Sequence, residues 1–106
     1  MVYQVVWTLK ALESYISNMK YLEKAWTEKE VNRFAALVEK KIKLLSVQPG
    51  IGTSRNKKQL HTRHTVLHKR ISLIYRVKPQ KKEIELLLFW NTYQHPSRLK
   101  AKTTAL

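Results

Sequence analysis

Several residue types that build common functional sites are missing or scarce in this chain. It contains no cysteine, which excludes a disulfide framework, a cysteine-ligated zinc site and a thiol nucleophile. All seven acidic residues are glutamate, and this shortage of carboxylates disfavours a calcium or magnesium site. Only two glycines occur among the 106 residues, too few for a glycine-rich loop around a nucleotide phosphate. We therefore expect neither a cofactor nor a metal ion.

Long apolar runs are also absent. No stretch reaches the roughly 18 consecutive apolar residues that span a bilayer, and residues 1–7 lack the basic and apolar regions of a signal peptide. We expect a cytoplasmic protein without a membrane partner. At this length the chain forms one domain, which we place at residues 1–98, followed by a basic tail at 99–106.

Positive charge is abundant and unevenly distributed. The chain has 21 Lys and Arg against seven Glu, for a formal net charge of +14. Residues 1–50 hold eight of these cations and five Glu, whereas residues 51–106 hold thirteen cations and two Glu. Such an excess implies a polyanionic or acidic partner, and the second half of the chain is where we expect it to bind.

The first half of the sequence predicts one strand and two helices. Residues 2–7 are rich in strand-forming side chains, and Thr8 can cap the helix that follows. Thr27 and Glu30 form a capping-box pattern, with Trp26 and Val31 placed for a hydrophobic staple. Both helices carry apolar side chains three or four residues apart. The second helix should end at Pro49, so the two helices form an antiparallel hairpin.

The second half predicts strands. Residues 58–63 read as a weak, exposed strand that residues 65–67 continue, residues 71–77 as a second strand, and residues 83–90 as a central strand buried on both faces. The expected fold is α+β, in the order β-α-α-β-β-β, with the helical hairpin packed on one face of an antiparallel sheet. Trp7, Trp26, Phe34 and Phe89 occupy positions typical of core residues.

Three histidines in the second half, His61, His64 and His68, have spacings that invite a metal-site interpretation. In a regular strand His61 and His64 point to opposite faces, while His64 and His68 share one. No acidic residue lies near them in the sequence. A polar strand face is therefore the better interpretation, and we expect no metal.

A basic cluster surrounds these histidines and is the main candidate for a binding surface. Its members are Arg55, Lys57, Lys58, His61, Arg63, His64, His68, Lys69 and Arg70. Arg76 and the polar stretch at residues 91–95 follow on later strands. Basic groups interleaved with aromatic rings on a sheet can hold a phosphate backbone and stack bases. The simpler alternative is a basic face that docks an acidic protein segment.

Catalysis without a metal is one use of such a surface. A ribonuclease needs a general base, a general acid and cations that stabilise the charged transition state. Tyr93 and His95 are the candidates for proton transfer, and Lys58, Arg63 and Arg70 for holding the phosphate. Lys57, His61, His64 and Arg76 would extend the contact with the target.

The order of several short segments resembles the RelE/ParE superfamily of type II toxin–antitoxin toxins over nearly the whole chain. These segments are residues 5–8 (VVWT), 48–52 (QPGIG), 74–77 (IYRV), 86–90 (LLLFW) and 93–96 (YQHP). The resemblance implies a toxin that is neutralised by a cognate antitoxin through a partly disordered acidic segment. It also implies one of two targets. RelE-like members cleave mRNA on the ribosome, whereas ParE-like members poison DNA gyrase and are not nucleases.

One position separates these two targets. RelE-like toxins commonly carry an arginine where this chain has Ser72, and Arg70 is the nearest substitute, expected on the same strand face. The sequence favours an mRNA endonuclease by a small margin because Tyr93 and His95 are present. The alternatives are a gyrase inhibitor without hydrolytic activity and a nucleic-acid-binding module without toxicity.

Trp90 is the candidate for antitoxin binding. Neighbouring strand residues point to opposite faces, so if Phe89 faces the helices, Trp90 faces away from them. We expect Trp90 to be exposed there, where an antitoxin segment could cover it.

Overall fold

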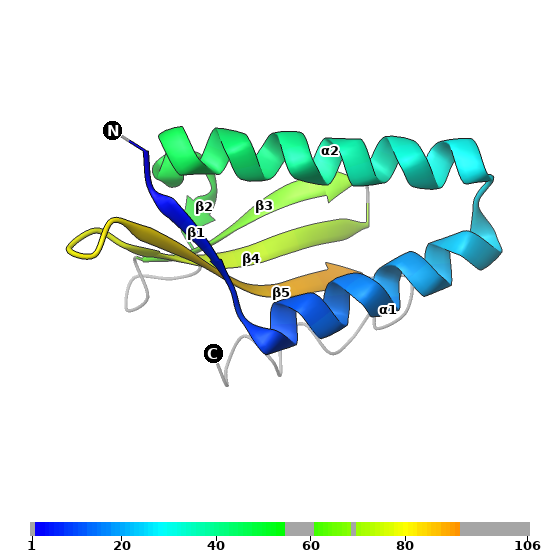
Figure 1. Cartoon of the computed structure of the whole chain (residues 1–106), viewed down its shortest axis with the longest axis horizontal. Helices are drawn as coiled ribbons and strands as arrows, with labels where there is room; N and C mark the ends of the chain where they lie inside the picture. The colour runs from blue at the N-terminus through cyan, green and yellow to red at the C-terminus, as the bar shows by residue number, and fades with distance from the viewer. Residues whose placement is uncertain (1, 55–60, 69, 92–106) are drawn as a thin grey trace.

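The computed structural model describes residues 2–54, 61–68 and 70–91. Two long helices and a five-stranded sheet form two layers (Figure 1). The elements are β1 (Gln4–Trp7), α1 (Leu9–Ala25), α2 (Glu28–Val47), the 3-10 turn η1 (Pro49–Ile51), β2 (Thr53–Ser54), β3 (Thr62–His68), β4 (Ile71–Lys78) and β5 (Glu83–Asn91). The α+β class, the helical hairpin and the order of the main elements are as the sequence predicts.

The sheet is mixed, and this detail differs from the antiparallel sheet expected. Its strand order is β1-β5-β4-β3-β2, with β1 parallel to β5 and every other pair antiparallel. Parallel neighbours need a long connection, and everything between Trp7 and Glu83 supplies it. The pairing of the first strand with the last cannot be read from local patterns. The two-residue strand β2 is likewise an addition to the expected order.

Both predicted helix starts are confirmed. Thr8 Oγ1 accepts a hydrogen bond from the Ala11 amide at 3.1 Å. Thr27 Oγ1 accepts from the Glu30 amide at 3.2 Å, and the Thr27 amide donates to Glu30 Oε1 at 3.1 Å, which completes the capping box. Helix α2 ends at Val47, just ahead of Pro49 as expected.

The main core lies between the helices and one face of the sheet. Phe34 and Phe89 are buried there, as predicted, and Trp26 packs against the same cluster. Trp7 is 39% exposed, so its assignment to the core is wrong. Strand β1 is an edge strand, and the Trp7 ring stacks on Phe89 with ring centroids 5.5 Å apart and makes an edge contact with Tyr15 at 5.7 Å.

A second, smaller apolar cluster lies on the other face of the sheet, which we call the open face. It consists of Ile74, Leu88 and Trp90, with Leu87 packed against it. A bulge places Leu87 as an extra residue in β5, because Tyr75 pairs with Leu86 and Ile74 pairs with Leu88. No helix in the described ranges is long and apolar enough to cross a membrane.

Candidate functional site

The open face is the candidate functional surface, because it carries side chains from β3, β4 and β5 side by side. Two cross-strand rows define it. Val66, Ser72 and Trp90 are paired in register in one row, and Thr62, Arg76 and Glu85 in another. Between them His64 pairs with Ile74, and Ile74 with Leu88. One end of the surface is therefore neutral and largely apolar, and the other is charged.

The neutral end contains the position at which RelE-like toxins commonly carry an arginine. Ser72 lies there between Val66, which is 59% exposed, and the buried Trp90. Arg70 lies in the turn before β4, which begins at Ile71, and it is exposed. The described part of β4 thus places no arginine at this end of the open face.

Trp90 faces away from the helices, as the sequence predicts, but it is not exposed. Its side chain is only 2% accessible and packs with Ile74 and Leu88. Strand alternation predicts only the face to which a side chain points. It does not predict that Trp90 packs with two large apolar side chains on that face. The expectation of an exposed Trp90 is therefore wrong.

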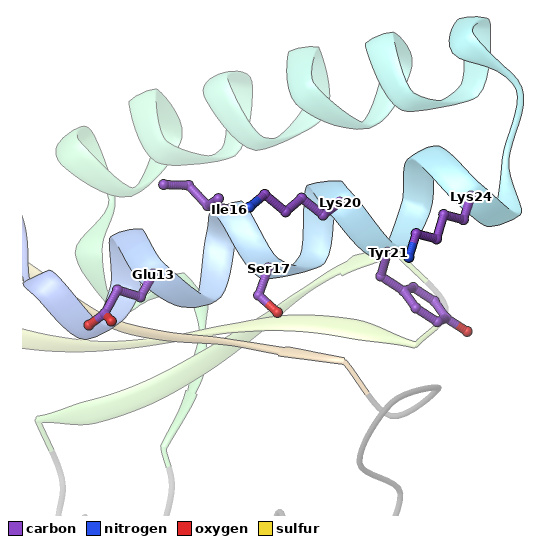
Figure 2. Close-up of a pocket in the computed structure, with 6 residues that line it drawn as sticks. All are labelled: Glu13, Ile16, Ser17, Lys20, Tyr21 and Lys24. Atoms are coloured by element: carbon purple, nitrogen blue, oxygen red, sulfur yellow. The ribbon is translucent and has the colours of Figure 1, made fainter.

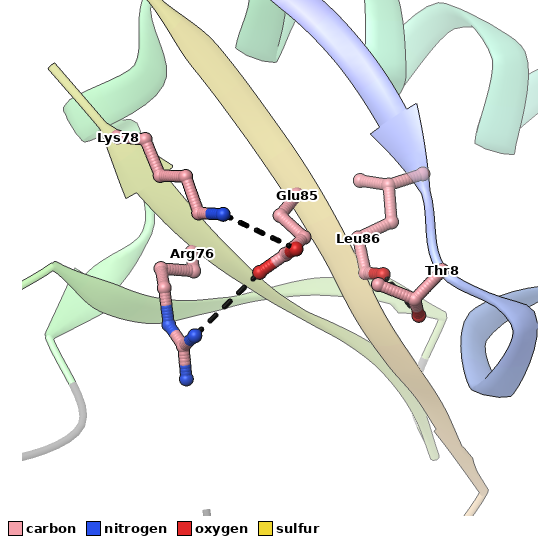
Figure 3. A network of polar contacts seen from close by, with 5 residues as sticks. All are labelled: Thr8, Arg76, Lys78, Glu85 and Leu86. Atoms are coloured by element: carbon pink, nitrogen blue, oxygen red, sulfur yellow. Dashed lines mark hydrogen bonds and ion pairs between the residues drawn. The ribbon is translucent and has the colours of Figure 1, made fainter. Parts of the chain in front are cut away.

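The charged end is built around the carboxylate of Glu85 (Figure 3). Glu85 Oε1 lies 3.5 Å from Arg76 Nη1, and Glu85 Oε2 lies 3.4 Å from Lys78 Nζ. The side chains of Arg76 and Lys78 remain 39% and 33% exposed. Solvent screens such pairs, and each stabilises the fold by at most about 1 kcal/mol. Arg76, a predicted target-binding residue, is thus accessible but shares its charge with Glu85.

Arg63, which the sequence predicts to hold a phosphate, is hydrogen-bonded to the backbone. Its side chain lies on the helix side of the sheet, where Arg63 Nη1 donates to the carbonyl oxygen of Gly52 at 2.6 Å and to that of Gly50 at 3.3 Å. These bonds fasten the segment that follows α2. Arg63 pairs in register with Tyr75, so the two side chains hold the same segment from neighbouring strands.

Tyr75 is a structural residue that the sequence interpretation did not single out. Its fully buried hydroxyl donates to the Pro49 carbonyl at 2.9 Å and accepts from the Gly52 amide at 3.0 Å. Burial raises the pKa of Tyr75, while the Gly52 hydrogen bond and the Arg63 charge oppose that rise. The sequence offered one signal for this role: a tyrosine among aliphatic residues of a strand is expected to be buried, and a buried hydroxyl needs a hydrogen-bond partner.

The three histidines do not gather at one place. His61 lies in a turn before β3, and His64 lies on the open face opposite Ile74. The ring centroid of His68 is 4.8 Å from that of Trp26 on the helix side. A register shift between Val66 and His68 reverses the face that strand alternation assigns to His68. In residues 2–54, 61–68 and 70–91, no three potential metal-ligating side chains cluster.

Four predicted site residues lie outside the described residues. They are Lys57, Lys58, Tyr93 and His95. The proposed proton-transfer pair therefore stays a prediction from the sequence.

Several hollows also mark the described helical layer. One, of about 560 Å³, is lined by Trp7, Tyr15, Val38 and Ile42 among others. Another, of about 500 Å³, runs along the outer side of α1, where the Lys20 side chain extends toward Ile16 and the Lys24 side chain toward Tyr21 (Figure 2). Neither of these two hollows contains a residue of the predicted basic cluster.

Solved toxin structures share this fold. A chain of the chromosomal ParDE system from P. aeruginosa matches 85% of this chain and 96% of its own length, with 20% identity and a TM-score of 0.67. An E. coli RelE mutant in the free state matches 99% of this chain and 97% of its own length, with 12% identity and a TM-score of 0.63. A chain of the RelBE2 toxin–antitoxin complex from Mycobacterium tuberculosis matches 86% of this chain and 99% of its own length, with 21% identity and a TM-score of 0.58. No curated protein matches the sequence significantly.

The two-layer α+β domain is thus the fold of these solved toxin structures. A family profile described as ParE toxin of type II toxin-antitoxin system, parDE, matches residues 5–96. The chain belongs to this ParE toxin family. It is accordingly the toxin of a type II system and has a cognate antitoxin as its partner.

Proposed function

We propose that this toxin acts by binding DNA gyrase and not by cleaving mRNA. The observation that carries the proposal is the position of Ser72 between Val66 and Trp90. Phosphodiester cleavage requires cations placed where negative charge develops in the transition state. A serine between two apolar side chains cannot supply that charge.

Two other cations of the predicted site, Arg63 and Arg76, support the same conclusion. Arg63 is directed away from the open face and bonds to the Gly50 and Gly52 carbonyls. Arg76 shares Glu85 with Lys78. Arg63, one of the three side chains expected to hold the phosphate, is thus engaged with the backbone, and Glu85 partly offsets the charge of Arg76. A binding toxin needs only a complementary surface, and it tolerates this arrangement.

Paired assays on the same protein test the proposal. The purified chain should inhibit ATP-dependent supercoiling of relaxed plasmid by gyrase, and co-addition of the antitoxin should restore it. Transcripts mapped at their 5′ ends after induction in cells should remain intact. A Tyr93→Phe/His95→Ala double variant should keep its toxicity. Normal supercoiling together with cleaved transcripts would overturn the proposal and favour the mRNA endonuclease, in which Arg70, Tyr93 and His95 are the candidate catalytic residues.

A further inference from the structure

A basic hollow of about 510 Å³ lies at the β4–β5 hairpin, away from the Ser72 end of the open face. It is lined by His61 and by hairpin residues 76–81, including Arg76, Lys78 and Lys81. Its size is within the range of sites that hold small ligands. Neither Lys78 nor Lys81 belongs to the basic cluster that the sequence indicates.

Backbone hydrogen bonds fix the shape of this hollow. The Lys82 amide donates to the Pro79 carbonyl at 3.2 Å and closes the turn, with Lys82 itself in the left-handed region at φ 54°. The Val77 amide donates to the His61 carbonyl at 2.8 Å, which holds His61 against the hairpin. The Gln4 amide donates to the Lys82 carbonyl at 2.9 Å and ties the turn to β1. A ligand would therefore meet a preformed site.

The charge of the hairpin favours an anion. Residues 76–85 contain four cations and two glutamates. The contacts of Glu85 with Arg76 and Lys78, at 3.5 and 3.4 Å, are longer than the 2.7–2.9 Å typical of strong charge-assisted hydrogen bonds. Arg76 and Lys78 can therefore turn toward an incoming anion at little cost. Lys81 adds a third cation at the exposed rim.

We propose that this hollow binds the phosphate groups of a nucleic-acid strand. A guanidinium provides paired donors for phosphate oxygens, and flexible ammonium groups add charge beside it. The Pro79 ring contributes an apolar surface at the same place. DNA and RNA share the phosphodiester chemistry that these groups recognise.

The sheet topology favours a phosphate backbone over a peptide strand. Strand β4 lies between β3 and β5, and β5 lies between β4 and β1. Both strands of the hairpin are therefore interior strands, so a peptide cannot extend the sheet here as it does at an exposed edge. The proposal does not depend on gyrase being the target.

Fluorescence anisotropy with labelled single-stranded DNA and RNA decamers of one sequence tests the site. The full chain, freed of antitoxin, is compared with a Lys78→Gln/Lys81→Gln variant. The matched control, Lys20→Gln/Lys24→Gln, removes the same charge from the outer side of α1 (Figure 2). The hairpin variant should bind roughly ten- to thirty-fold more weakly at 0.1 M salt, with a salt dependence reduced by about 1.4 in log–log slope. Circular dichroism checks that each variant folds.

The affinity of the control variant for the decamers should fall by less than about three-fold, which is the effect of long-range charge alone. Equal losses in both variants, or none in the hairpin variant, would overturn the proposal. So would a poly-glutamate peptide that displaces the decamers more effectively than unlabelled DNA or RNA does, because the site would then be one for acidic peptides. Similar affinities for the DNA and RNA decamers support recognition of the phosphodiester backbone, which both share. A preference for one of the two decamers identifies whether DNA or RNA is the ligand.

Discussion

Asn18 of helix α1 is hydrogen-bonded to the backbone of Phe89 in strand β5, with Asn18 Nδ2 donating to the Phe89 carbonyl at 3.0 Å. From the same helix, Ser14 Oγ accepts from the Phe89 amide at 2.9 Å. Strand β1 pairs with β5 only as far as Leu86. Beyond that point the two helix side chains satisfy the backbone groups of Phe89. The helix therefore both covers the sheet and protects part of a strand edge.

Replacement of Asn18 by leucine should destabilise the protein by about 1–3 kcal/mol, because the buried Phe89 carbonyl loses its side-chain donor. Urea unfolding followed by circular dichroism measures the change. Ser17→Ala, on the outer side of α1 (Figure 2), is the control and should stay within about 0.5 kcal/mol of the wild type. Equal stabilities for Asn18→Leu and Ser17→Ala would show that the Phe89 contact contributes little.

The two glycines should respond very differently to alanine. A Cβ atom at Gly52 would collide with the Tyr75 hydroxyl and lie 2.7 Å from the His64 carbonyl oxygen, whereas one at Gly50 would meet nothing within 4 Å. Gly52→Ala should cost about 1–3 kcal/mol through overpacking. Gly50→Ala should leave the unfolding midpoint in urea close to that of the wild type. A reversed order of the two midpoints would contradict this account of the segment after α2.

Tyr75 predicts a stability change at alkaline pH. Burial raises its pKa above the ordinary value of 10.0, so the folded state favours the neutral phenol. Stability from this group is fully present below pH 10 and falls as the pH rises from there through the folded-state pKa. The fall in unfolding free energy above pH 10 should be shallower in Tyr75→Phe than in the wild type. Tyr15, whose pKa is raised by burial as well, remains in both proteins.

At neutral pH, Tyr75→Phe should itself cost about 1–3 kcal/mol. It removes the hydroxyl bonded to Pro49 and Gly52. Identical alkaline profiles for the two proteins would mean that the phenol does not ionise differently on folding.

Trp90→Ala should destabilise the protein by about 3–5 kcal/mol, because a nearly fully buried ring would leave a cavity beside Ile74 and Leu88. This reverses the emphasis that the sequence suggests, in which antitoxin binding suffers more than stability. Thermal unfolding and antitoxin titration on the same samples compare the two effects. Val66→Ala is the control, because Val66 is exposed at the neutral end of the open face and its replacement removes no core side chain. An unchanged melting temperature for Trp90→Ala would restore the original interpretation.

Local chemistry made much of the fold predictable. The capping boundaries at Thr8 and Thr27, the helix stop at Pro49 and the strands around residues 71–78 and 83–91 depend on neighbours within a few residues in sequence. The candidate site was less predictable, since two register irregularities changed the outcome. One directs His68 toward Trp26, and the other makes Leu87 an extra, unpaired residue in the register of β5 with β4.

The sequence by itself determined the class of fold and the location of the positive charge, because periodicity, caps and composition are local or additive properties. The order of several short segments gave, in addition, a resemblance to a toxin superfamily. Only the tertiary structure decided how individual side chains are used. It directed Arg63 into the segment after α2, buried Trp90, and placed His61 against the hairpin that carries Arg76, Lys78 and Lys81. These outcomes depend on which strands pair and in what register, and long-range pairing is not encoded in any single stretch of residues.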